Sequence, residues 1–166
     1  MSSNIILGID PGTATTGYGV IDSSPSRGEG RVGVMKSIEF GCIRTSKDNS
    51  LPERLEEIYN DLQKLIKKYQ PDKIAVESVY FYNNVKTAIA VAQARGVVLL
   101  CARQNKTPVL EFTPLQVKNN LTNYGKAEKK QVQQMVKTLL NLKSIPKPDD
   151  AADALALAIC GANKNL

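Results

Sequence analysis

Two short apolar runs near the start of the chain, separated by a tight turn, constrain the fold most. Residues 4–10 (NIILGID) end in an acid and are followed by Pro11 and Gly12, and a second run covers residues 17–22. Apolar runs of this length on either side of a Pro-Gly turn predict a β-hairpin. A third antiparallel strand is expected over residues 31–45, either regular or with a bulge at Gly41.

The pattern changes from strand to helix at Leu51. Apolar residues then recur every three or four positions until Pro71, which predicts one long helix. The rest of the chain alternates strands at residues 73–78 and 108–112 with helices at residues 85–104, 114–121, 129–142 and 149–162. Three strands, a helix and then alternating elements predict an α/β domain with a mixed sheet. The length of 166 residues fits a single domain over residues 1–166.

The chain contains no histidine, and this excludes several kinds of active site. Ser-His-Asp triads, Cys-His pairs and histidine-containing metal sites all need an imidazole. The widely spaced Cys42, Cys101 and Cys160 form no Cys-x-x-Cys pair and fit a reducing compartment. Because no export signal or membrane-length apolar stretch is visible, we expect a cytoplasmic protein without a membrane partner. Any chemistry must use carboxylates, lysines or hydroxyls.

The overall charge is basic. Lysine and arginine total 22 against 16 aspartates and glutamates, and the formal net charge is +6. This excess indicates an anionic partner such as a nucleic acid. Any single lysine is by default a solvated surface charge, so composition does not select particular lysines.

Carboxylates stand at the ends of two predicted strands and at the start of the last predicted helix. Asp10 and Glu77 end the strands, and Asp150 and Asp153, three residues apart, share one helix face. Taken singly, most of them are explained as turn, N-cap or first-turn acids, although a purely solvated role fits Glu77 poorly. If the four converge, their repulsion requires a compensating cation. Ligands that are all oxygen favour Mg²⁺ or Mn²⁺.

Several segments, in order over nearly the whole chain, resemble the RuvC family of bacterial Holliday junction resolvases, the crossover junction endodeoxyribonucleases. The matching segments are GIDPG (8–12), TGYG (16–19), IAVE (74–77), TPLQVK (113–118) and DAADALA (150–156). The resemblance implies an RNase H-like fold with a mixed central sheet flanked by helices. It also implies a homodimer that cleaves two strands of a four-way DNA junction in recombination and repair.

The resemblance also assigns residues to roles. It implies catalytic and metal-ligating roles for Asp10, Glu77, Asp150 and Asp153, with a pair of Mg²⁺ ions expected at each site and Mn²⁺ as a substitute. Such a pair activates the attacking water and stabilises the departing oxygen. Some members of the family carry histidine where Asp150 stands. Ser78 stands where glutamine is familiar, which leaves contacts around the ligands open but not the ligands themselves.

DNA contacts are implied in the same way. Lys118 and Lys129 match basic positions of the family, which implies phosphate binding and, for Lys118, support of catalysis. Tyr80, Phe81 and Tyr82 are consecutive, and consecutive side chains cannot all enter one core. The resemblance implies that one aromatic here stacks at the open centre of the junction, Tyr80 matching best and Phe81 next. Core packing explains either one equally well. Association with the branch-migration proteins RuvA and RuvB is implied by the resemblance alone.

Small residues at four-residue spacing mark the predicted helix over residues 85–104: Ala88, Ala92 and Gly96. They would let this helix approach another one closely. A helix of the same chain and one of a second copy explain the stripe equally well. Symmetric cleavage of a junction favours the second copy, because it needs two active sites about a two-fold axis.

Two other functions stay open at this point. One is an inactive junction-binding protein of the same fold, against which the complete set of acids argues. The other is a phosphate-binding domain of the actin-like ATPase and sugar-kinase group, whose first hairpin also carries an Asp-x-Gly-Thr loop resembling residues 10–13 (DPGT). Proteins of that group need a second lobe, for which this chain is too short.

Overall fold

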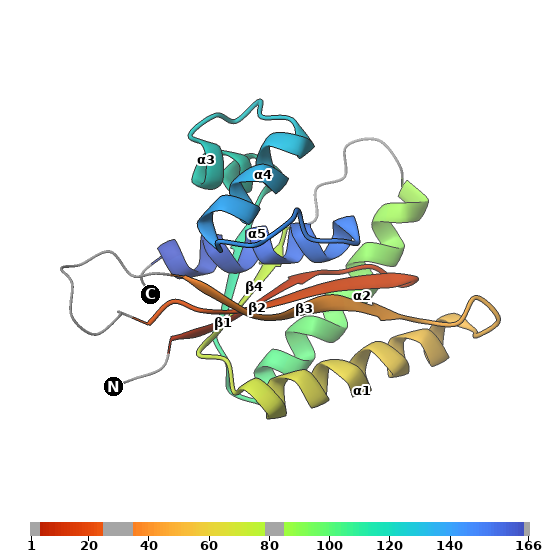
Figure 1. The fold of residues 1–166 in the computed structure, drawn as a ribbon. Coiled ribbons are helices and arrows are strands. Elements are labelled where there is room, and N and C mark those ends of the chain that lie inside the picture. Colours follow the sequence, from red (N-terminus) through yellow and green to blue (C-terminus); the bar gives the residue numbers. More distant parts are fainter. Residues whose placement is uncertain (1–3, 25–34, 79–84, 165–166) are drawn as a thin grey trace.

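The computed structural model describes residues 4–24, 35–78 and 85–164. Within these ranges, five strands form one sheet in the order β3-β2-β1-β4-β5 (Figure 1). The strands are β1 (Ile5–Asp10), β2 (Thr15–Asp22), β3 (Lys36–Arg44), β4 (Lys73–Glu77) and β5 (Val109–Phe112). β1, β2 and β3 pair antiparallel, whereas β4 runs parallel to both β1 and β5. The mixed sheet expected from the sequence is confirmed.

Helices cover both faces of the sheet (Figure 1). One face carries α1 (Leu51–Tyr69) and α2 (Val85–Gln104), and the other carries α3 (Pro114–Thr122), α4 (Lys129–Leu139) and α5 (Asp149–Asn163). Among the described residues, no helix combines the length and the apolar content needed to span a membrane.

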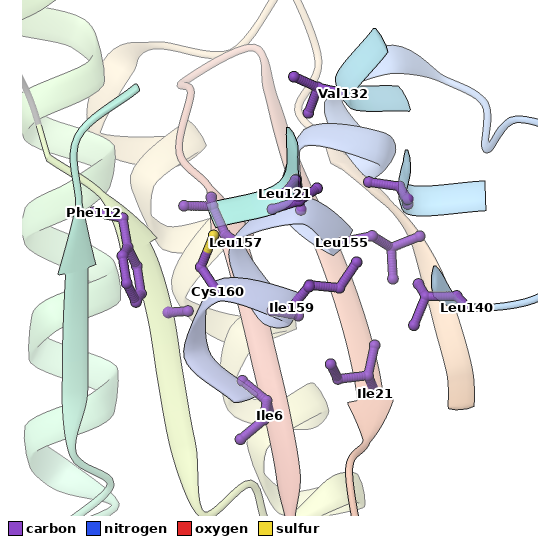
Figure 2. Packing of buried hydrophobic residues seen from close by; sticks show 14 of the residues in the cluster. Ile6, Ile21, Phe112, Leu121, Val132, Leu140, Leu155, Leu157, Ile159 and Cys160 are labelled. Carbon is purple, nitrogen blue, oxygen red and sulfur yellow. The ribbon is translucent and has the colours of Figure 1, made fainter. Parts of the chain in front are cut away.

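Each face of the sheet has its own hydrophobic core. On the α5 side, Ile6, Ile21 and Phe112 of the strands pack against Leu155 and Ile159 of α5 (Figure 2). On the α1 side, alternate strand residues pack against α1 and α2: Leu7, Ile9, Val20, Ile43, Ile74 and Val76. This alternation follows from the two-residue period of a strand, and it decides which strand residues face α5.

Helix α3 begins at Pro114, as the sequence predicts, and local hydrogen bonds stabilise its first turn. Thr113 Oγ1 accepts a hydrogen bond from the Gln116 backbone N–H at 3.1 Å, and Gln116 Oε1 accepts one from the Thr113 N–H at 2.9 Å. This reciprocal pair is a capping box, and Pro114 occupies the first helical position, where no donor is needed. The TPLQVK segment therefore starts a helix that holds Lys118 in its second turn.

The irregularity in β3 lies at Ile38, so the alternative of a bulge at Gly41 was wrong. Val20 pairs with Glu39 and Ile21 with Ser37, which leaves Ile38 as the extra residue. Gly41 pairs regularly with Tyr18, and a Cβ at Gly41 would lie 2.9 Å from the Tyr18 hydroxyl oxygen. The glycine therefore makes room for the Tyr18 side chain and does not break the strand. The start of the expected strand, residues 31–34, lies outside the described residues.

Candidate active site

Asp10 and Glu77 end neighbouring parallel strands and point to the same face of the sheet. Ile9 of β1 pairs with Val76 of β4, and Asp10 and Glu77 directly follow these two paired residues. Ile9 and Val76 belong to the core on the α1 side. Because successive side chains alternate between faces, Asp10 and Glu77 face α5.

The first turns of α5 lie directly against the backbone of β1 and β2. A Cβ at Gly8 would be 2.0 Å from the Ala154 carbonyl oxygen, and one at Gly17 would be 2.1 Å from the Asp150 carbonyl oxygen. Both clashes are with backbone, so a side chain could be admitted only by moving the helix. These glycines therefore let α5 bring Asp150 and Asp153 beside the strand acids.

A cavity of about 250 Å³ lies over these acids, between α5 and the α3–α4 pair. Its polar lining consists of Asp10, Glu77, Asp153, Lys118 and Lys129. The apolar lining is Pro114, Val117, Val132, Ala156 and Leu157. Asp150 is not a lining residue, but it is close enough to raise the pKa of Asp10. The structure thus brings the four predicted carboxylates and both predicted lysines to one site.

The acids disfavour one another's ionised forms. The pKa of Asp10 is raised from 3.8 to about 7, mainly by burial and then by Glu77, Asp153 and Asp150 in that order of importance. The pKa of Glu77 is raised by burial and then by Asp153. Burial also raises the pKa of Asp153, although its hydrogen bond with Lys129 acts in the opposite direction. The site is therefore a strongly negative, partly dehydrated cluster that attracts cations.

Lys129 already supplies one positive charge to this cluster. Its Nζ lies 3.1 Å from Asp153 Oδ2 and 3.5 Å from Asp149 Oδ2. Asp149 Oδ1 is also 3.1 Å from Lys147 Nζ. The sequence does not predict the contact of Asp149 with Lys129. No local pattern signals this contact, because the two residues belong to helices that meet only in the folded chain.

Tyr80 and Phe81 lie outside the described residues, between β4 and α2. The choice between stacking and core packing for these aromatics stays a prediction. The flanking Ser78 is described, and its backbone N–H donates to the Phe112 carbonyl oxygen at 2.8 Å. This bond continues the β4–β5 pairing just past Glu77.

The RuvC family model, described as crossover junction endodeoxyribonuclease RuvC, matches residues 6–161. The chain belongs to the RuvC family. A RuvC from Desulforamulus reducens is 56% identical over 158 residues, which are 95% of this chain and 93% of the relative. A RuvC from Thermosipho melanesiensis is 54% identical over 155 residues, covering 93% of this chain and 94% of the relative. The family expected from the sequence segments is confirmed.

Solved RuvC structures share the fold. The Thermus thermophilus RuvC structure matches with a TM-score of 0.86 at 34% identity and covers 95% of this chain and 93% of that one. T. thermophilus RuvC in complex with Holliday junction substrate matches with a TM-score of 0.86 at 32% identity, covering 96% of this chain and 93% of that one. The RNase H-like α/β architecture expected from the RuvC resemblance is confirmed. The actin-like ATPase and sugar-kinase alternative is not favoured.

Proposed function

We propose that this chain is an endodeoxyribonuclease that cleaves four-way DNA junctions by hydrolysing a phosphodiester bond. One observation carries the proposal. Carboxylates from β1, β4 and α5 line one cavity together with two lysines, in a chain of the RuvC family. The T. thermophilus relative that shares this fold is solved in complex with a Holliday junction substrate. The activity is therefore assigned to the cavity above Asp10.

The chemistry of the donor set fits divalent metal ions. Among the described residues, no three acidic or cysteine side chains lie in an arrangement that could hold a metal ion. The ligands proposed from the sequence are nevertheless all carboxylates, and burial and neighbouring acids raise the pKa of Asp10, Glu77 and Asp153. We propose that Asp10, Glu77, Asp150 and Asp153 hold Mg²⁺, expected as a pair of ions, with Mn²⁺ as a substitute. When bound, such ions would supply an activated water and would stabilise the leaving 3′ oxygen.

The residues of this chain have separate tasks in that reaction. Asp10 and Glu77 end neighbouring paired strands, so the sheet fixes the backbone that carries both side chains. Asp153 would help to hold the cation, and its contact with Lys129 keeps that ammonium at the same site, where it would bind a DNA phosphate. Lys118 of α3 lines the same cavity, and from there it would neutralise the phosphate being cleaved.

DNA binding draws on further residues. Phosphate contacts of Lys118 and Lys129 would give affinity without base preference. Tyr80 and, next to it, Phe81 are proposed to stack on bases at the open centre of the junction. Discrimination of a junction from plain duplex would then depend on shape, since every duplex offers the same phosphates.

A homodimer is proposed from the exposed face of α2. The opposite face packs on the sheet and α1 through Ala94, Val98, Cys101 and Ala102. Ile89 and Leu100 are each 51% exposed, and a Cβ at Gly96 would meet nothing within 4 Å. These positions recur at helical spacing and share the exposed face of α2 with Gln93 and Arg103, and Gly96 lies near the centre of that face. Closest approach of a second α2 at Gly96 would place two active sites about a two-fold axis.

Two expectations about the cellular setting rest on the family resemblance. RuvA and RuvB are proposed as partners that present the junction, and the cytoplasm is proposed as the compartment because the substrate is DNA. A pull-down with purified RuvA and RuvB on a junction would test the first.

The experiment that tests the function uses a synthetic four-way junction with labelled strands. We expect paired nicks when Mg²⁺ is present and none in a chelating buffer, with little cleavage of a plain duplex of the same sequence. Junction binding without metal-dependent cleavage would instead identify an inactive junction-binding protein. Cleavage of duplex and junction at equal rates would contradict the proposed selectivity for junctions.

A further inference from the structure

The turn between α3 and α4 presents an exposed apolar pair that the cavity does not use. Leu115 is 57% exposed and Tyr124 is 55% exposed. A Cβ at Gly125 would lie 2.5 Å from Leu115 Cδ1, so Leu115 rests against the turn that carries Tyr124. Leu115 and Tyr124, which both adjoin this turn, are here called the turn patch.

The turn that carries Tyr124 is held by hydrogen bonds on both sides. The Tyr124 N–H donates to Thr122 Oγ1 at 3.1 Å, and the Thr122 hydroxyl is within 3.0 Å of the Tyr124 carbonyl oxygen. The Ala127 N–H donates to the same carbonyl at 3.0 Å. Asn123, at φ 54°, ends α3 in the left-handed region that asparagine tolerates well. A binding partner would thus meet a backbone that is already ordered.

Lysines lie close to the turn patch along the chain. Residues 114–139 contain five lysines and one acidic residue. Lys126 and Lys130 are exposed on the turn and on the first turn of α4. Lys118 follows Leu115 by three residues on α3 and lines the cavity, so the patch continues into the site proposed to hold the cleaved phosphate.

We propose that the turn patch and its flanking lysines bind a duplex arm of the DNA substrate. The edge of a duplex alternates charged phosphates with apolar deoxyribose rings. Leu115 and Tyr124 would pack on the sugars while Lys126 and Lys130 neutralise phosphates on either side. The inference rests on the proposed function for its ligand, and continuity with the cavity favours DNA over an acidic protein. Tyr124 and Leu115 thereby extend the DNA contact beyond the reacting phosphate.

The test measures the affinity of the full-length protein for a labelled four-way junction and for a plain duplex, both without divalent ions. A Leu115→Ala/Tyr124→Ala double variant is expected to bind both DNAs about tenfold more weakly, because it removes the apolar side chains that pack on the sugars. Its salt dependence should stay that of the wild type. Lys126→Gln/Lys130→Gln should instead lower the salt slope by roughly 0.9 for each phosphate that is no longer neutralised. Tyr124→Phe should bind as the wild type does, since the ring is kept.

Matched controls are available elsewhere on the surface. Ile38→Ala removes an exposed apolar side chain from β3, and Lys67→Gln removes a lysine from α1, so neither should change DNA affinity. Thermal unfolding of every variant checks that the fold is kept.

Two outcomes would overturn the inference. If the double variant binds both DNAs as tightly as the wild type does, the turn patch does not contribute to DNA binding. If only the affinity for the junction falls, these residues contact the open centre of the junction and not a duplex arm. Absence of Mg²⁺-dependent cleavage by the wild type would count against the proposed function alone, because duplex affinity would still decide the role of the patch.

Discussion

Burial and the neighbouring acids both disfavour the ionised form of Asp10. The ordinary pKa of an aspartate is 3.8. The pKa of Asp10 in the folded chain is about 7, first because of burial and then because of the neighbouring acids. Between these two values the folded chain binds more protons than the unfolded chain. The free energy of unfolding must therefore decrease as pH rises through this window when no cation is bound.

We predict that Asp10→Asn removes much of this pH dependence. In chelating buffer at pH 8 the variant should be more stable than the wild type by about 1 to 4 kcal/mol, given about 1.4 kcal/mol for each unit of pKa shift. At pH 4 the difference should be small. Urea unfolding across this pH range measures the effect, and parallel profiles for the two proteins would contradict it. Mg²⁺ should stabilise the wild type more at pH 8 than at pH 5.

Removing single carboxylate charges tests the metal ligands. We predict that Asp10→Asn, Glu77→Gln, Asp150→Asn and Asp153→Asn each abolish junction cleavage but leave junction binding largely intact. Each change removes a ligand charge and none reduces the basic surface. Gel-based cleavage and fluorescence anisotropy measure the two properties. Asp61→Asn, on the surface of α1, is the control and should cleave normally. Substantial Mg²⁺-dependent turnover by a site variant would exclude that residue as a ligand.

At the scale of elements, the contact of α5 with β1 and β2 assembles the site. We predict that Gly17→Ala lowers the free energy of unfolding by about 1 to 3 kcal/mol, because its Cβ would meet the Asp150 backbone. The helix must move outward to relieve the overlap, and Asp150 moves with it. Cleavage should fall by more than the lower stability explains. Denaturant unfolding and junction cleavage at a temperature where the variant stays folded separate the two effects.

Gly41→Ala is the matched change on the neighbouring strand. Its Cβ would meet the hydroxyl end of the Tyr18 side chain, which can shift without moving a helix. A smaller loss of stability with normal cleavage is therefore expected. Equal damage to cleavage by both substitutions would mean that the α5 contact has no special role.

At the scale of the whole molecule, the exposed face of α2 leads to a prediction about assembly. Gly96→Glu should convert the protein from dimer to monomer and abolish paired nicking, because it puts a charged side chain at the proposed point of closest approach. The fold of each monomer should persist, since nothing lies within 4 Å of the added Cβ and glycine is a poor helix former. Light scattering coupled to gel filtration measures the mass. A wild type that is monomeric at assay concentrations, or a variant that stays dimeric, would contradict the dimer.

Local periodicity made the elements predictable from the sequence. The two-residue alternation of a strand and the three- to four-residue spacing of a helix are properties of short segments, so β1, α1 and α3 begin and end close to where their residues indicate. The same reasoning put Asp10 and Glu77 at strand ends. The TPLQVK segment contains both residues of its own capping box, so the start of α3 needed no tertiary information.

Only the tertiary structure decided how the separate parts meet. Asp150 and Asp153 reach Asp10 because glycines on two strands admit α5 against bare backbone, a fit between segments at opposite ends of the chain. The Lys129 contact with Asp149 and Asp153, the bulge at Ile38 and the exposed face of α2 likewise depend on packing partners distant in sequence. The sequence by itself determined the elements and the acids that stand at their ends, because covalent geometry sets local periodicity. Close packing between distant segments determined their arrangement.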